Sequence, residues 1–100
     1  MFNLFKKNRE PKQFPPEIEK EIAYLQNHPR RDEYKVIVMD ASDSPDFDER
    51  KPNIVYTYGM DSCMVGIYDA FEELQWEYPS DVEDAIACAE KLTKEYRKEI

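Results

Sequence analysis

The chain has 100 residues, of which 41% are hydrophobic and 13% aromatic, and its formal net charge at pH 7 is -8. This length fits one domain, and the apolar content is typical of a folded core rather than a disordered chain. The absence of any run of about 18 apolar residues excludes a membrane-spanning helix from the sequence pattern. The acidic excess disfavours direct nucleic-acid binding, which requires clustered Lys and Arg side chains.

The first segment, residues 1–13, is expected to be a flexible N-terminal tail, followed by a single α+β domain over residues 14–100. The tail carries apolar side chains ahead of basic ones, at Phe2, Leu4, Phe5, Lys6 and Lys7. This order leaves two alternatives open: residues 1–9 contact an anionic membrane surface, or the terminus frays and its Phe side chains pack back on the domain. The start of the chain turns polar after five residues and predicts no secretory signal.

A helix of about eleven residues is predicted to begin at Pro15-Pro16, because proline is tolerated in a first helical turn. Apolar side chains recur on one face of this helix at Ile18, Ile22 and Leu25. The helix should end near residue 28, since Pro29 disfavours a helical conformation in the residue before it.

Two strands are predicted next. Residues 33–40 contain four consecutive apolar residues at positions 36–39, a pattern typical of a strand covered on both faces. Residues 41–52 form a charged, proline-containing loop, and residues 53–59 alternate in the manner of a second strand. Loops of this length without regular structure are often binding segments.

The stretch from Asp61 to Tyr78 permits two interpretations. Most of its large apolar side chains are spaced by three or four positions, which favours a helix over residues 62–77. The alternation of Cys63, Val65 and Ile67 instead favours a third strand closed by a hairpin. We expect the helix, because it accounts for more residues.

The last element is a helix that begins after a capping box at Ser80 and Glu83 and runs to about Lys98. Together these elements predict an α+β fold: an N-terminal helix, a small antiparallel sheet of two or three strands, and a C-terminal helical pair packed on one face.

The acidic charge is concentrated in the middle of the chain. Residues 40–90 hold 14 acidic and 2 basic side chains, a net charge of -12. On the helical interpretation, the carboxylates between positions 69 and 77 stack on one face, and a basic protein surface would be attracted to them. We therefore predict a non-catalytic protein-binding module, of the kind exemplified by small inhibitor or immunity proteins that block a nuclease or a nucleic-acid-binding protein. The predicted contacts are Asp43, Asp46, Asp48, Glu49, Asp69, Glu72, Glu73, Trp76 and Glu77.

Other chemistry finds little support in the sequence. The acidic loop fails the EF-hand pattern, because Pro45 and Lys51 stand where glycine and a bidentate glutamate are needed, although four of its carboxylates could gather a weakly held cation. His28 and Cys63 are the residues that an enzyme would need. Neither has a second catalytic residue at a sequence spacing typical of an active site. We expect no metal and no cofactor. The two cysteines, Cys63 and Cys88, are expected to be reduced in a cytoplasmic protein, and a homodimer formed through a sheet edge is a further alternative.

Overall fold

A computed structural model describes residues 14–60, 62–68 and 71–99 of the chain. Its helical elements are α2 (Pro16–Asn27), the short 3-10 helix η1 (Arg31–Glu33) and α3 (Val82–Glu99). Its strands are β1 (Lys35–Met39), β2 (Asn53–Thr57), β3 (Cys63–Tyr68) and β4 (Leu74–Glu77). The predicted N-terminal tail, residues 1–13, lies outside the described residues.

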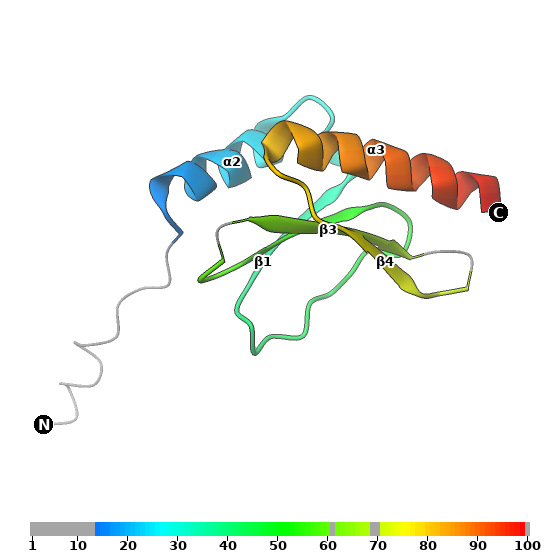
Figure 1. Ribbon diagram of the computed structural model, residues 1–100, viewed down its shortest axis with the longest axis horizontal. Helices are drawn as coiled ribbons and strands as arrows, with labels where there is room; N and C mark the ends of the chain where they lie inside the picture. The colour runs from blue at the N-terminus through cyan, green and yellow to red at the C-terminus, as the bar shows by residue number, and fades with distance from the viewer. Residues whose placement is uncertain (1–13, 61, 69–70, 100) are drawn as a thin grey trace, which may run out of the picture.

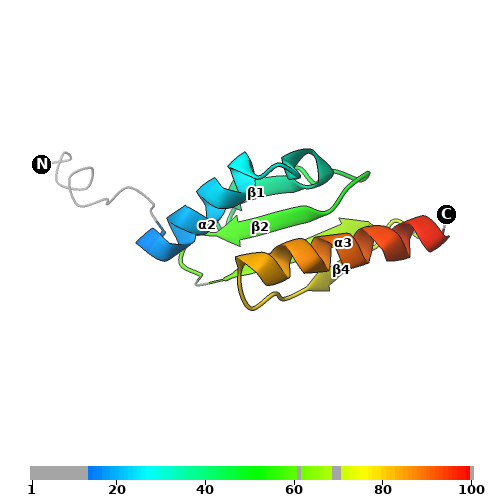
Figure 2. The same cartoon turned by 90° about the horizontal axis from the view of Figure 1, so that it is seen from above.

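The four strands form one mixed sheet in the order β1-β2-β3-β4. The β1–β2 pair is parallel, and the β2–β3 and β3–β4 pairs are antiparallel. Helices α2 and α3 lie side by side over the same face of this sheet (Figures 1 and 2). The predicted antiparallel sheet of two or three strands is therefore wrong, and so is the C-terminal helical pair: one helix precedes the sheet and one follows it.

The helix predicted over residues 62–77 is instead the β3–β4 hairpin. Residues Cys63, Val65 and Ile67 point toward the helices and are buried, whereas the residues between them face the opposite side. The spacing by three and four that suggested a helix arises from the apolar residues of two strands and the turn between them. Glu72, in this turn, has a φ of 65°, a left-handed conformation that no continuous helix contains.

The parallel pairing of β1 and β2 explains the length of the loop over residues 40–52. A parallel connection must return along the whole strand, which takes a dozen or more residues, whereas an antiparallel hairpin closes in two. This loop runs beneath the sheet, on the side away from both helices (Figure 1). We call residues 40–52 the acidic loop, and the sheet face it follows the loop face.

The main core lies between the helices and the sheet. The helix side contributes the predicted apolar face of α2, with Ile18, Ile22 and Leu25, and the inner face of α3 with Ala85 and Leu92. The start of α3 differs by one residue from the prediction: Asp81, not Ser80, caps it, accepting the Asp84 N–H at 2.8 Å. Asp84 in turn accepts the Ser80 N–H at 2.9 Å, which fixes the entry of the chain into the helix.

Two buried tyrosines of this core differ in hydrogen bonding and give a paired prediction. The Tyr34 hydroxyl donates to the Leu25 carbonyl at 2.6 Å, whereas the Tyr56 hydroxyl meets the thiol of Cys63, a weak partner, and makes no hydrogen bond of regular geometry within the described ranges. We expect Tyr34→Phe to lower the free energy of unfolding by about 1–2 kcal/mol, and Tyr56→Phe to leave it unchanged or slightly raised. Urea unfolding of both variants measures the difference, and equal losses would contradict this assignment.

Candidate functional site: an acidic loop against an aromatic cluster

The acidic loop is fastened to the loop face by one aromatic side chain. The ring of Phe47 meets the ring of Trp76 edge to face, with centroids 5.6 Å apart, and the ring of Tyr68 at 6.4 Å. Edge-to-face contacts at these separations are attractive. Phe47, Tyr68 and Trp76, hereafter the aromatic cluster, are all half-buried, so part of each ring surface remains open to a partner.

The position of Trp76 depends on Gly66, its neighbour across the β3–β4 pair. A Cβ atom at Gly66 would lie 2.6 Å from Cζ3 of the indole and 2.7 Å from Cε3, closer than real contacts allow. The absence of a side chain at position 66 therefore lets the six-membered ring of the indole lie directly against Gly66 of β3, where it contacts Phe47.

A buried amide holds the other end of the acidic loop. Asn53, at the start of β2, is 0% exposed. Its carbonyl oxygen accepts the Asp48 N–H at 2.8 Å, and its amide nitrogen donates to the Asp48 carbonyl at 3.0 Å. This reciprocal pair, with further donation to the carbonyls of Lys51 and Gly66, fixes the path of the loop across the sheet.

Two of the predicted loop carboxylates also shape the loop, and a third is exposed. The carboxylate of Asp43 accepts the Asp40 N–H at 2.8 Å, and that of Asp48 accepts the Arg50 N–H at 2.7 Å. Asp46 is fully exposed, with its carboxylate 3.8 Å from Nζ of Lys35, which also donates to the Asp46 backbone carbonyl. A surface pair of this length contributes little to stability, so the Asp46 charge is still available to a partner.

The remaining predicted contacts are divided between two places. Glu49 is exposed on the acidic loop, and Glu72 and Glu73 are exposed in the β3–β4 turn. Glu77 lies on the helix side of the sheet, where its carboxylate is 2.8 Å from Nζ of Lys91 on α3. Asp69 lies outside the described residues. The structure therefore brings the acidic loop and Trp76 together, and it separates Glu77 from them.

The sequence-based set omits aromatic residues that lie in this cluster or next to β4. Phe47 and Tyr68 complete the aromatic cluster, and two strongly exposed rings, Phe71 at 80% and Tyr78 at 73%, bracket β4. Of these residues, Phe47 is the one that the sequence best indicates as part of a site, because it is the single aromatic residue within a charged loop. Tyr and Trp side chains of this kind are favoured anchors in protein interfaces.

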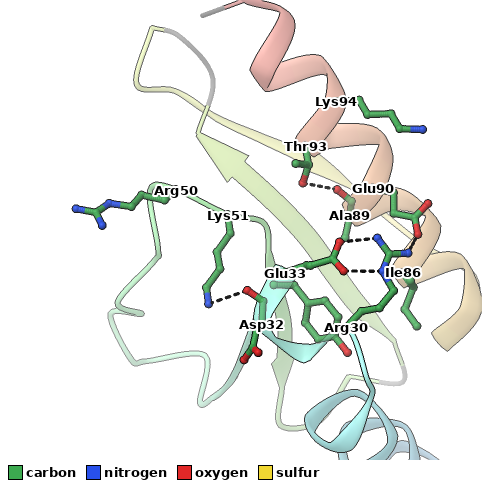
Figure 3. A pocket seen from close by; sticks show the side chains of 11 residues that line it. Arg30, Asp32, Glu33, Arg50, Lys51, Ile86, Ala89, Glu90, Thr93 and Lys94 are labelled. Atoms are coloured by element: carbon green, nitrogen blue, oxygen red, sulfur yellow. Dashed lines mark hydrogen bonds and ion pairs between the residues drawn. The ribbon is translucent and has the colours of Figure 1, made fainter.

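A cavity of about 640 Å³ lies on the other side of the sheet, between η1 and α3. Arg30 crosses it and pairs with Glu33 and Glu90, while Nζ of Lys51 donates to the Asp32 carbonyl (Figure 3). Two further cations on its rim, Arg50 and Lys94, point away from it in the same view. Arg30 is thus paired with two carboxylates and Lys51 with a backbone carbonyl, and we do not assign this cavity a ligand.

The thiols have the opposite properties from those of a nucleophile. Burial raises the pKa of Cys63 to about 11, and burial also raises the pKa of Cys88. A reactive cysteine needs a lowered pKa and exposure. Within the described ranges, no three His, Cys, Asp or Glu side chains are grouped so as to hold a metal ion.

The raised pKa of Cys63 predicts a loss of stability in alkali. The fold favours the neutral thiol, so its contribution is complete below the ordinary pKa of 9.0 and is lost as the pH rises through about 11. We expect the free energy of unfolding to fall by about 2 kcal/mol more between these limits in the wild type than in Cys63→Ala. Urea unfolding across this pH range tests it, and parallel curves for the two proteins would contradict it.

Comparison of the chain with protein-family models, with curated proteins and with solved structures gives no match. Among the helices in the described part of the chain, none has the length and apolar character needed to cross a membrane. The membrane alternative for residues 1–9 concerns a segment outside the described residues.

Proposed function

We propose that this chain is a non-catalytic protein-binding module, whose acidic loop and aromatic cluster engage a basic surface on a protein partner. The contact between Phe47 and Trp76 is the observation that carries the proposal. It joins the carboxylates of the loop to partly exposed rings on one sheet face. Interfaces combine such aromatic anchors with charged rims that steer the partner.

The charge distribution supports a basic partner. Residues 40–90 have a net charge of -12. A field of this sign speeds the approach of a basic protein and repels nucleic acid, whose phosphates are negative. Nucleases and nucleic-acid-binding proteins carry basic surfaces for their own substrates. An inhibitor or immunity-type role toward such a protein, in the cytoplasm, is therefore the form of the proposal that we favour.

The test is capture from native lysate with matched variants. The wild type and the control Glu17→Lys/Glu19→Lys, which changes two exposed α2 carboxylates, should retain the same basic protein at low salt. Asp46→Lys/Glu49→Lys, with the same change in net charge, should retain at least about tenfold less of it, and about 0.5 M NaCl should release it. Equal capture by all three proteins, or captured proteins that are not basic, would overturn the proposal.

A further inference from the structure

The sheet ends in an edge strand beside the aromatic cluster. In the order β1-β2-β3-β4 that the described residues form, β4 is an outer strand and pairs with β3 as its neighbouring strand. Half of the backbone N–H and C=O groups of Leu74–Glu77 therefore point outward from the sheet. An outward row of this kind is a template on which another extended chain can pair.

The surroundings of this edge are acidic. Glu72 and Glu73 lie at its beginning, in the turn, and both are exposed. At its end, Glu77 and Glu95 lie near the ammonium group of Lys91, and both raise its pKa. Of the described charged side chains named here, four are carboxylates and one is an ammonium group. A second copy of this chain would bring an equally acidic β4 edge to the contact, and like charges disfavour that pairing.

Two exposed rings stand at the ends of the strand. Phe71 precedes β4 and is 80% exposed, and Tyr78 follows it directly and is 73% exposed. Lysine and arginine stems pack well on such rings, and their charged ends are attracted to the ring faces. The outward backbone groups of β4, the carboxylates around it and the two exposed rings therefore all favour an extended chain with basic side chains.

We propose that the outer edge of β4 accepts an extended, lysine- or arginine-rich segment of the partner as a fifth strand of the sheet. This inference rests on the proposed function in that the partner is a basic protein, and it adds the mode of recognition. Backbone hydrogen bonds to β4 hold the segment, and its basic side chains lie beside Glu72 and Glu73.

The test uses an octapeptide of alternating lysine and threonine, added to the full chain labelled with nitrogen-15. We expect amide shifts in residues 74–77 of β4 and none in β1, the other edge of the sheet. The same peptide methylated at every inner backbone nitrogen keeps its charge but loses its donors, and it should bind at least about tenfold more weakly. Glu72→Lys/Glu73→Lys should weaken the unmodified peptide about tenfold, and the control Glu17→Lys/Glu19→Lys should weaken it less than about twofold.

Equal binding of the two peptides, shifts at β1 instead of β4, or no binding of either peptide would overturn the fifth-strand inference. The proposed function would still stand if the lysate capture depends on Asp46 and Glu49, because side-chain charges alone would then explain recognition. The opposite result is also informative. If the shifts in β4 require the N–H donors of the peptide, and Asp46→Lys/Glu49→Lys captures as much protein from the lysate as the wild type, the role of β4 is supported and that of the acidic loop is overturned.

Discussion

Replacement of Gly66 with alanine is expected to lower the free energy of unfolding by about 1–3 kcal/mol. The new Cβ would lie 2.6 Å from Cζ3 of Trp76, so the indole must leave its place over β3. Alanine is otherwise at least as favourable as glycine inside a strand, so strain against the indole is the source of the loss. Urea unfolding measures the cost, and a shift of the native Trp76 emission to longer wavelength reports the displaced ring.

A double-mutant cycle isolates the cause of this effect. In a Trp76→Leu background, the same Gly66→Ala change should cost about 1 kcal/mol less, because the smaller side chain leaves room for the Cβ. An identical cost in the two backgrounds would show that the indole is not what limits position 66. The cycle needs no partner, so it tests the architecture of the aromatic cluster by itself.

Substitution of Asn53 by alanine is expected to cost about 2–3 kcal/mol and to loosen the acidic loop. The amide is 0% exposed and makes the reciprocal pair with the backbone of Asp48, so its removal leaves the N–H and C=O groups of that residue without their partners. Faster hydrogen exchange of the Asp48 amide should accompany the loss of stability.

Asn27→Ala is the matched control for this substitution. Its side-chain amide donates to the Ala23 carbonyl at 2.8 Å, but it lies at the exposed end of α2, where water replaces the lost bond. We expect a cost below about 0.5 kcal/mol. If the two asparagine variants lose the same amount, the Asn53 amide is not the clamp that holds the loop.

Local patterns predicted part of the fold. The face of Ile18, Ile22 and Leu25 marks α2, which is observed at Pro16–Asn27 and confirms the helix. The apolar run within 33–40 marks β1, observed at Lys35–Met39. These predictions succeed because helical and strand periodicities are properties of a single segment and need no knowledge of its neighbours.

Pairing between segments was not predictable in the same way. The sequence of the β3–β4 hairpin also fits a helical repeat, because its turn spaces the apolar residues of the two strands by three or four positions. The alternation of Cys63, Val65 and Ile67 was the correct signal, but it covers one strand only. The parallel pairing of β1 with β2 depends on the path of the acidic loop, which neither strand sequence specifies.

The candidate site was predicted in its residue types but not in its arrangement. The acidic loop and Trp76 are about thirty positions apart in the chain. The sheet places Trp76 where Phe47 of the loop contacts it, and no local sequence pattern indicates this contact. The loss of the predicted helix also removes the carboxylate stack at positions 69–77 and places Glu77 beside Lys91. An acidic loop against an aromatic sheet face replaces the acidic helix face that the sequence suggested.

The most direct measurement is the fluorescence of Trp76, the one tryptophan of the chain, during titration with deca-lysine. We predict a saturable change in emission at low salt that disappears at about 0.5 M NaCl. Asp46→Lys/Glu49→Lys should weaken the binding about tenfold, and Glu17→Lys/Glu19→Lys should leave it nearly unchanged. An emission that does not respond to deca-lysine, or that responds equally in all three proteins, would contradict the docking of a basic surface at this face.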